Sequence, residues 1–401
     1  LGAQTFVRAS RAAVAILSNQ FVFANSIEEA IRHAKNLGEN TCVSFDMLGE
    51  GARTEAQAAR YLAAYQQAIV QTAQLQNPKT PAHQGANVSI KLTALHPRFE
   101  ETQRAHVLPE LIARLAPLVE EAMRLKVAIT IDAEESERLE LSLDLIEALL
   151  AQINPPANML GLAVQAYGLR CPDLIDHVAA LAKKYHTSIA VRLVKGAYWD
   201  AEIKRAQELG LPSYPVFTHK SHTDLSYLAC AAKLFDYADY LYPMFATHNA
   251  ATMAAVRALA GTSQHFEFQR LHGMGQSMYE AAAKDLSVPV RIYAPVGEPR
   301  DLLAYLVRRL LENGANTSFV HKLADWQVPA ASLTELPLQI HTRSKLASPS
   351  KLFGTSRANS KGLDLMMRST LHALEDLQNY AADNKPLEAK VLGNAHKNRA
   401  Q

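Results

Sequence analysis

Short apolar segments alternate with amphipathic segments along most of this chain, from residue 41 to about residue 312. The apolar segments are rich in β-branched residues, which is typical of buried strands. Several of the segments between them open on a residue that caps helices, as at Thr54 and Asn249. The pattern predicts eight strands, at residues 41–46, 87–92, 127–132, 160–165, 188–194, 240–247, 265–269 and 288–293.

Strands that alternate with helices are typical of parallel βαβ units, which close into a barrel or extend into an open sheet. Eight units within about 250 residues match a (β/α)8 barrel better than an open doubly wound sheet, which remains the alternative. Further helices are predicted over residues 8–20, after Ser26 and over residues 363–382. We expect a helical segment over residues 1–40, the barrel over residues 41–325, and a C-terminal extension and linker over residues 326–401.

Composition places the chain among ordinary globular proteins, since 48% of the 401 residues are hydrophobic and the formal net charge is +2. Without a sustained basic stripe, nucleic acid is not an expected partner. The cysteines Cys42, Cys171 and Cys230 are far apart, which indicates a reducing compartment and neither a disulfide framework nor a zinc cluster.

No apolar run approaches the roughly 20 residues that span a bilayer and no signal peptide is evident, so we expect a cytoplasmic location. Because the first residue is Leu1, we also expect a piece of a longer or processed protein.

The stretch from residue 188 to residue 200 is informative because the strand predicted within it contains a charge. A buried charge is costly unless a charged or polar group pairs with it. Arg192 is therefore either half of an ion pair with a neighbouring strand or a cation that faces a ligand at the C-terminal end of a parallel strand. A Lys-Gly-Ala-Tyr-Trp turn and a helix that ends at Gly210 follow it.

Polar residues also end the other predicted strands, and in a (β/α)8 barrel these ends surround the active site. One such residue is more often part of a structural ion pair, but the whole set indicates a ligand site at one mouth of the barrel. The set comprises Asp46, Glu50, Lys91, Asp132, Glu134, Glu135, Gln165, Arg192, Lys195, Thr247, His248, Asn249, Gln269, His272 and Tyr293.

The predicted helix over residues 298–312 has two different faces. One face carries Tyr305, Arg308, Arg309 and Glu312, and the opposite face carries Leu303, Leu306, Val307 and Leu310. The polar face is either an ordinary solvated face or, with two adjacent arginines beside a tyrosine, an anion clamp over a pocket.

The absence of several known motifs reduces the number of enzyme classes to consider. A GxGxxG dinucleotide motif, a Walker loop, a GxSxG elbow and an HExxH helix are all absent. His248 with Asp132 is a weak candidate for a metal site, since the histidines lack the spacing of metal ligands. A lyase that forms a Schiff base on Lys91 or Lys195 is a stronger alternative, and a non-enzymatic scaffold is a third.

Seven longer motifs occur in order between about residue 27 and about residue 365. They are FDMLGE at 45–50, SIKLTALHP at 89–97, DAEES at 132–136, RLVKGAYW at 192–199, FATHN at 245–249, EFQRLHGMG at 267–275 and YLVRRLLENG at 305–314. Together they resemble the flavin-dependent proline dehydrogenase domain of the bacterial proline utilization A proteins.

The resemblance implies a distorted (β/α)8 barrel that binds FAD non-covalently, with its last helix over the barrel mouth. It implies oxidation of L-proline to Δ1-pyrroline-5-carboxylate, the first step of proline catabolism. A hydride passes from proline C5 to flavin N5, and the electrons then pass to a membrane quinone. Because such a quinone lies in the membrane, the resemblance also allows peripheral association of the protein with the inner face of the bacterial plasma membrane. Bifunctional members continue into a pyrroline-5-carboxylate dehydrogenase module, towards which the residues beyond about 365 are expected to lead.

The resemblance also assigns roles to individual residues. Arg192 is implied beside flavin N5, while Lys91, Arg308 and Arg309 are implied to hold the substrate carboxylate, and these four are the expected catalytic residues. Glu50 is expected to pair with Arg308 as a gate over the substrate. The other residues expected at the substrate are Asp132, Ala197, Tyr198, Leu271, Tyr293 and Tyr305.

A larger set of residues is implied to contact the cofactor. Gly196 belongs to it because a backbone that lies close to a cofactor leaves no room for a side chain. The full set is Asp132, Gln165, Arg192, Val194, Gly196, Ala197, Tyr198, Trp199, Thr218, Lys220, Thr247, His248, Asn249, Gln269, Leu271 and Glu312.

Overall fold

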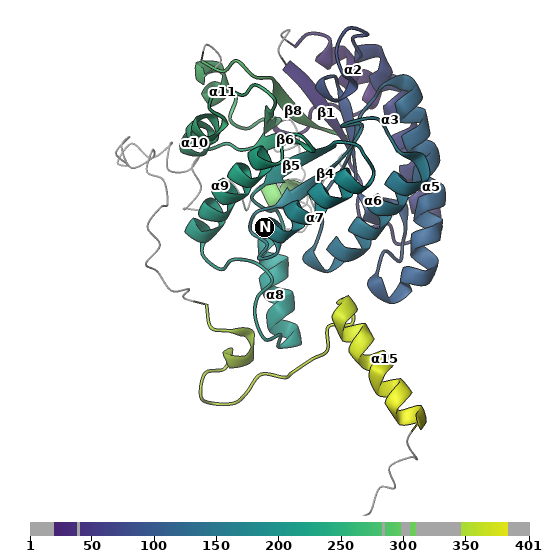
Figure 1. Cartoon of the computed structure of the whole chain (residues 1–401), viewed down its shortest axis with the longest axis vertical. Helices are drawn as coiled ribbons and strands as arrows, with labels where there is room; N and C mark the ends of the chain where they lie inside the picture. Colours follow the sequence, from purple (N-terminus) through teal and green to yellow (C-terminus); the bar gives the residue numbers. More distant parts are fainter. Residues whose placement is uncertain (1–19, 38–40, 283–284, 298–304, 310–345, 384–401) are drawn as a thin grey trace, which may run out of the picture.

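The computed structural model describes residues 20–37, 41–282, 285–297, 305–309 and 346–383. Eight parallel strands close into a barrel in the order β1 to β8 (Figure 1). The strands are β1 (Thr41–Met47), β2 (Asn87–Ile90), β3 (Ile129–Ile131), β4 (Leu160–Gln165), β5 (Ile189–Val194), β6 (Leu241–Ala246), β7 (Glu267–Leu271) and β8 (Val290–Val296). The predicted barrel is therefore confirmed, and the open sheet is excluded because β1 pairs with β8 along its whole length.

Helices connect the strands and cover the outside of the barrel (Figure 1). The helices are α2 (Ile27–Ala34), α3 (Glu55–Thr72), α4 (Leu92–Leu95), α5 (Arg104–Leu125), α6 (Leu139–Ile153), α7 (Cys171–Lys184), α8 (Trp199–Leu209), α9 (Lys220–Asp236), α10 (Ala250–Ala260), α11 (Gln276–Ala282) and α15 (Arg368–Asp383). Residues 305–309 are also helical. The predicted caps are confirmed, since the side chains of Ser26, Thr54 and Asn249 accept main-chain N–H groups at the starts of α2, α3 and α10. Among the described helices, none is both long enough and apolar enough to cross a membrane.

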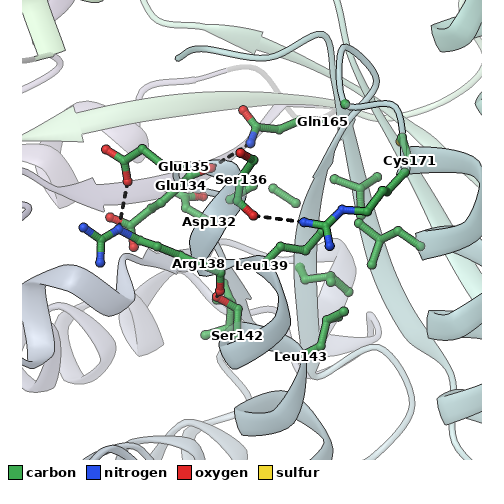
Figure 2. Close-up of a pocket in the computed structure, with 18 of the residues that line it drawn as sticks. Asp132, Glu134, Glu135, Ser136, Arg138, Leu139, Ser142, Leu143, Gln165 and Cys171 are labelled. Atoms are coloured by element: carbon green, nitrogen blue, oxygen red, sulfur yellow. Dashed lines mark hydrogen bonds and ion pairs between the residues drawn. The ribbon is translucent and has the colours of Figure 1, made fainter. Parts of the chain in front are cut away.

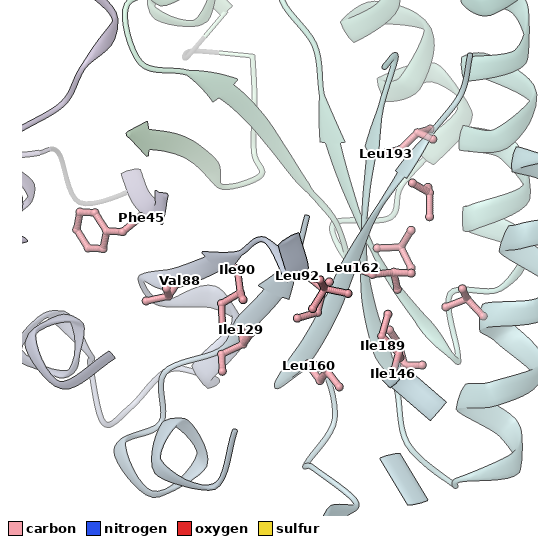
Figure 3. Packing of buried hydrophobic residues seen from close by; sticks show 14 of the residues in the cluster. Phe45, Val88, Ile90, Leu92, Ile129, Ile146, Leu160, Leu162, Ile189 and Leu193 are labelled. Carbon is pink, nitrogen blue, oxygen red and sulfur yellow. The ribbon is translucent and has the colours of Figure 1, made fainter. Parts of the chain in front are cut away.

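Alternation along each strand decides which side chains face the helices and which face the inside of the barrel. In β5, Ile189, Val191 and Leu193 pack in the main hydrophobic core between strands and helices (Figure 3). The alternate residue Arg192 therefore faces the inside of the barrel, where its side chain is only 3% exposed.

A second cation inside the barrel, Arg291 of β8, pairs with Glu267 of β7, and both side chains are completely buried. The guanidinium Nε lies 2.6 Å from Oε1 of Glu267, and Nη2 lies 2.8 Å from Oε2. Arg291 also donates to the main-chain oxygens of Gly85 and His83, at 2.6 and 2.7 Å. Because both charges are paired and the guanidinium is fully hydrogen-bonded, the core tolerates them.

The C-terminal segment, residues 346–383, lies against α8 and reaches the residues just before α5. Asp364 forms two hydrogen bonds with Arg205 of α8, at 2.6 and 2.5 Å, and the N–H of Gly362 donates to the oxygen of Leu209 at 2.7 Å. Arg368 donates to Glu101 at 2.7 Å. The helix predicted over residues 363–382 is found as α15, whereas the helix predicted over residues 8–20 lies outside the described residues apart from Gln20. The domain boundary near residue 325 also lies outside them and stays a prediction.

Candidate active site

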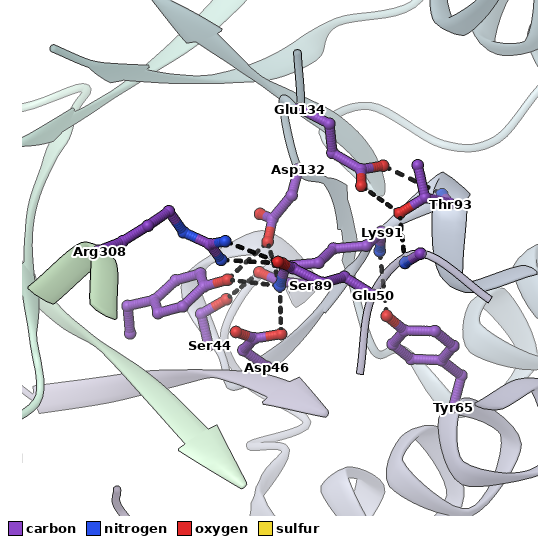
Figure 4. A network of polar contacts seen from close by, with 12 residues as sticks. Ser44, Asp46, Glu50, Tyr65, Ser89, Lys91, Thr93, Asp132, Glu134 and Arg308 are labelled. Carbon is purple, nitrogen blue, oxygen red and sulfur yellow. Dashed lines mark hydrogen bonds and ion pairs between the residues drawn. The ribbon is translucent and has the colours of Figure 1, made fainter. Parts of the chain in front are cut away.

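Lys91 lies at the C-terminal end of β2, at the centre of a polar network (Figure 4). Its Nζ lies 2.6 Å from Oδ1 of Asp46, 3.2 Å from Oδ2 of Asp132 and 3.4 Å from the hydroxyl of Tyr293. Burial acts to lower the pKa of Lys91, but the charge of Asp46 and its neighbours outweighs burial and raises that pKa well above its usual value. Lys91 is therefore an ammonium group, which is a poor nucleophile for the Schiff-base chemistry considered from the sequence.

Arg192 occupies the inside of the barrel behind this network. Its guanidinium lies 2.6 Å from Oδ1 of Asp132 and 2.7 Å from Oε1 of Gln269. It also lies 3.0 Å from the hydroxyl oxygens of both Ser44 and Ser89. The structure thus contains the ion pair that was the structural reading of Arg192, and the contact of Arg192 with a ligand stays a prediction.

Asp132 joins the two cations. Burial acts to raise the pKa of Asp132, but Lys91 and Arg192 outweigh it and lower that pKa, so the group is a carboxylate. The hydroxyl of Tyr293 donates to Oδ2 of Asp132 at 2.5 Å, and the guanidinium carbon of Arg192 lies 5.0 Å from the centre of the Tyr293 ring. Burial, together with Asp132, raises the pKa of Tyr293 well above its usual value, so Tyr293 remains a hydrogen-bond donor.

Arg308 and Glu50 form a bidentate ion pair beside this network, with N–O distances of 2.6 and 2.8 Å (Figure 4). The Arg308 and Glu50 side chains are 16% and 24% exposed, so the pair lies at the opening of the site. The guanidinium carbon of Arg308 also lies 5.0 Å from the centre of the Tyr198 ring, which follows β5. The structure therefore brings the helical residues 305–309 to the barrel mouth, and the role of the pair as a gate stays a prediction.

The last helix buries residues from both of the faces expected from the sequence. Tyr305 and Leu306 are both buried in a small cluster with Leu48 and Met274, whereas Val307, which was expected on the apolar face, is 43% exposed. Arg309 is buried and lies over the Tyr305 ring at 5.2 Å. The helix packs across the barrel mouth through its tyrosine-bearing side, a direction that helical spacing alone does not define. Leu303, Leu310 and Glu312 lie outside the described residues.

The turn after β5 has a structural reason for its glycine. Gly196 has φ +138°, and a Cβ at this position would lie 2.4 Å from the ring of Tyr167. The close neighbour that excludes a side chain is therefore a tyrosine within the protein. Beyond the turn, the N–H of Ala197 donates to Oε1 of Gln165 at 3.2 Å, and the indole of Trp199 donates to the oxygen of Phe217 at 2.9 Å.

The remaining expected cofactor residues lie around the ends of β5 to β7, and several of them support the local backbone. Lys220 pairs with Asp224 at 3.0 Å, and Lys195, a strand-end residue outside the expected cofactor set, pairs with the same carboxylate. Thr247 accepts from the N–H of Asn249 at 3.1 Å. Thr218 precedes α9, Val194 ends β5, and Leu271 ends β7.

The contacts of His248 and Asp132 do not support a metal site at these two residues. Nε2 of His248 accepts the main-chain N–H of Leu271 at 2.9 Å, and Asp132 is committed to Lys91 and Arg192. A different group of possible ligands comprises the exposed Glu55 and Glu110 and the buried His96. Arg114 contacts both carboxylates, at 2.7 and 3.6 Å, so a cation of the protein already pairs with them.

A cavity of about 70 Å³ lies beside the network, between the ends of β3 and β4 and the helices α6 and α7 (Figure 2). Asp132, Glu134 and Gln165 line it. The amide of Gln165 donates to the main-chain oxygen of Glu134 at 2.9 Å. Burial raises the pKa of Glu134 to about 7.

The sequence reasoning assigned no role to several residues that the structure places in the network. Asp46 and Glu134 were recognised as strand-end residues only, and Ser44, Ser89 and Tyr65 were not singled out. The hydroxyl oxygens of Ser44 and Ser89 lie 2.8 Å apart, and Tyr65 accepts the N–H of Lys91 at 3.0 Å. The two serines occupy inward positions of β1 and β2, so alternation along the strands was the signal that could have found them.

Comparison with known proteins gives consistent matches. The sequence model of the family described as Proline dehydrogenase matches residues 28–322. The chain is 46% identical over 384 residues to the bifunctional protein PutA of Klebsiella aerogenes and to that of Escherichia coli K12, which covers 90% of this chain and 29% of each relative. It is 28% identical over 311 residues to proline dehydrogenase 1 of Bacillus subtilis 168, covering 76% of this chain and 89% of that protein. The chain thus spans less than a third of the PutA relatives.

Solved structures agree with these relatives. A mutant of proline utilization A from Bradyrhizobium japonicum superposes with a TM-score of 0.84 at 48% identity, covering 94% of this chain and 40% of that one. Proline utilization A from Bdellovibrio bacteriovorus, inactivated by N-propargylglycine, gives a TM-score of 0.85 at 29% identity, covering 94% and 41%.

Proposed function

The chain belongs to the proline dehydrogenase family, and we propose that it oxidises L-proline to Δ1-pyrroline-5-carboxylate at the C-terminal mouth of its barrel. The observation that carries the proposal is the placement of the Arg308–Glu50 pair beside the buried network of Lys91, Asp132 and Tyr293 (Figure 4). The barrel mouth thereby combines an opening that can recognise a carboxylate with buried polar side chains behind it, from which bulk water is largely excluded.

The cation at the opening of the site suits an anionic substrate group. Lys91 and Arg192 are paired with the buried side chains of Asp46 and Asp132, whereas the Arg308–Glu50 pair is partly exposed at the opening. A substrate carboxylate can bind the Arg308 guanidinium there, and a guanidinium group suits its planar shape better than an ammonium group does.

In this proposal Arg308, Arg309 and Lys91 hold the proline carboxylate, and Glu50 closes over the substrate through Arg308. Tyr293, which Asp132 fixes through a hydrogen bond, forms part of the floor beneath the ring. Tyr198, Tyr305, Ala197 and Leu271 complete the walls. Holding the substrate in one orientation brings C5 to the oxidant and replaces solvent reorganisation with fixed charges.

The family consists of flavoenzymes, and we infer that the flavin is FAD. FAD supplies a two-electron acceptor for the hydride that leaves proline C5. The donors at the site fit such a group, because the Arg192 guanidinium can stabilise negative charge on a reduced cofactor and the Trp199 ring is partly exposed after β5. The other residues proposed to hold it are Gln165, Val194, Gly196, Thr218, Lys220, Thr247, His248, Asn249, Gln269 and, outside the described residues, Glu312.

For the parent protein, we propose a membrane quinone as the electron acceptor and a pyrroline-5-carboxylate dehydrogenase module after the present chain. The names and the much greater length of the bifunctional relatives support the second module. Reduction of a quinone would also require contact with the inner face of the plasma membrane.

Absorbance spectroscopy tests the proposed function. The chain is incubated with FAD, freed of unbound flavin and mixed with L-proline without an electron acceptor. We expect visible flavin bands that proline bleaches, and recovery of the bands when an artificial acceptor dye is added. A chain that retains no FAD, or whose bands do not respond to proline, contradicts the proposal. Borohydride trapping of a substrate on Lys91 or Lys195 would favour the lyase alternative.

A further inference from the structure

The backbone of the loop that carries Glu50 does not by itself fix the conformation of the loop. Glycines flank Glu50 on both sides, with φ +142° at Gly49 and +59° at Gly51. A Cβ at position 49 would lie 2.2 Å from the ring of Tyr61, which requires glycine there. Since glycine permits many conformations, contacts from elsewhere in the barrel have to fix the position of Glu50.

Thr93, in α4 after β2, supplies two of those contacts. Its hydroxyl oxygen accepts the N–H of Gly51 at 3.0 Å, and its main-chain oxygen accepts the N–H of Ala52 at 2.8 Å. Thr93 is only 5% exposed, so water cannot easily replace these bonds. The backbone directly after Glu50 is thereby attached to α4, the short helix that follows β2.

Glu134, after β3, in turn orients Thr93. Oε1 of Glu134 accepts the N–H of Thr93 at 3.1 Å, and the Thr93 hydroxyl donates to Oε2 of the same carboxylate (Figure 4). The hydroxyl proton of Thr93 is directed towards Glu134, which leaves a lone pair of the same oxygen for Gly51. A residue without a hydroxyl at position 93 would leave both Glu134 and the Gly51 N–H short of a partner.

These bonds continue around the mouth of the barrel and return to Glu50. The main-chain oxygen of Glu134 accepts from Gln165, whose Oε1 accepts from Ala197, and the next residue, Tyr198, lies under Arg308. Arg308 pairs with Glu50. We call this closed series of contacts the rim circuit, with the members Glu50, Gly51, Thr93, Glu134, Gln165, Ala197, Tyr198 and Arg308. It connects the ends of β1 to β5 with the last helix.

We propose that Thr93, oriented by Glu134, is a positioning residue that holds the Glu50 carboxylate in place for Arg308 and so controls how tightly proline binds. The inference rests on the proposed function. It adds two residues that do not touch the substrate, and it predicts that they act on proline only through Glu50.

Steady-state kinetics of the FAD-loaded full chain with L-proline and an acceptor dye test this inference. Thr93→Val keeps the shape of the side chain and removes the hydroxyl, and we expect the proline KM to rise about tenfold because an unpaired donor and acceptor remain. The kcat is expected to stay within about twofold, since the variant leaves the reacting groups in place. Thr93→Ser is the matched control, and its hydroxyl is expected to return the KM to within about twofold of the wild type.

A double-mutant cycle separates positioning from general damage. In a Glu50→Ala background, Thr93→Val is expected to change the KM by less than about twofold, because the group it positions is already gone. An equal rise in both backgrounds would overturn the inference, as would an unchanged KM for Thr93→Val in the wild-type background. If Thr93→Val does not fold, Glu134→Gln replaces it, and an unchanged KM for that variant would likewise overturn the inference.

The wild-type chain in the same assay distinguishes this inference from the proposed function. A wild type without proline oxidation would overturn the function and the inference together. An active wild type with an unaffected Thr93→Val variant would overturn the inference alone.

Discussion

At the scale of single residues, the site consists of charges that must stay paired, and Arg308 is the cation at its opening. Replacing it by methionine keeps much of the side-chain length but removes the charge that Glu50 and the substrate carboxylate share. We expect the proline KM to rise roughly thirtyfold, which corresponds to a loss of about 2 kcal/mol for a hydrogen bond between charged groups. Steady-state kinetics measure this change.

The control for this variant is Arg124→Met, which removes an exposed arginine that pairs with Glu121 on the surface of α5. Its KM should equal that of the wild type. Equal KM values for Arg308→Met and the wild type would show that Arg308 does not bind the carboxylate.

Glu134 makes a second prediction at this scale, because burial raises its pKa from 4.5 to about 7. The folded state then binds the proton of this carboxyl more tightly than the unfolded state does. The resulting stabilisation is complete below about pH 4.5 and is lost as the pH rises through about 7. The variant Glu134→Gln mimics the neutral carboxyl. As the pH rises from about 5 to about 8, its unfolding free energy should therefore fall less than that of the wild type.

The measurement is the midpoint of urea unfolding for both proteins across that pH range. The difference in unfolding free energy between them should change by no more than about 1.4 kcal/mol per pH unit. Parallel curves for the two proteins would show that Glu134 has an ordinary pKa.

At this scale, the sequence identified a residue where the chemistry of its side chain requires a partner. Arg192 was identified because a charge in an apolar strand requires a partner, yet the sequence did not show that Asp132, Gln269, Ser44 and Ser89 together satisfy it. Those partners come from four other strands or strand ends, so only the closed barrel brings them together. The roles of Arg308 and Glu50 came from the resemblance to a family, since nothing in their spacing indicates that residues 258 positions apart meet.

At the scale of elements, the buried pair of Arg291 and Glu267 fastens β8 to β7 and to the residues before β2. Glu267→Gln removes the negative charge and leaves a completely buried guanidinium uncompensated. We expect the unfolding free energy to fall by about 3–5 kcal/mol, the usual effect of breaking a buried pair from one side. Chemical denaturation measures the fall, with exposed Glu120→Gln on α5 as the control. A fall below about 1 kcal/mol would mean that the pair adds little to the barrel.

The strands and most helices could be predicted because their signals are local. β-branched runs, alternation and capping residues placed the eight strands near their observed positions, and β4 was placed at its observed bounds. The Arg291–Glu267 pair could not be predicted, since it depends on which residues of two strands lie opposite each other. The sequence left open whether the polar face of the last helix is solvated or lies over a pocket, because helical spacing does not show which side the barrel mouth covers.

At the scale of the whole molecule, the segment after residue 345 supports the barrel from outside. Asp364 is 6% exposed, and its two hydrogen bonds hold the segment against α8, the helix that follows the turn at Gly196 to Tyr198. The sequence predicted a loop and a helix here but not this contact, since the loop residues show no periodic pattern. The expectation of a C-terminal extension and linker over residues 326–401 therefore did not include the contacts that residues 346–368 make with the barrel domain.

Asp364→Asn tests that role. The variant removes the carboxylate that forms two hydrogen bonds with Arg205 and leaves the longer contact of Arg205 with Glu137 at 3.5 Å. A loss of about 2 kcal/mol would lower Tm by roughly 2–3 °C in a chain of this size. Limited proteolysis should cut residues 346–366 faster in the variant than in the wild type, because the segment separates from α8 more often. Asp376→Asn, an exposed aspartate of α15 in the same segment, is the control and should match the wild type in both measurements. If Asp364→Asn also matches the wild type, the segment lies on the barrel without stabilising it.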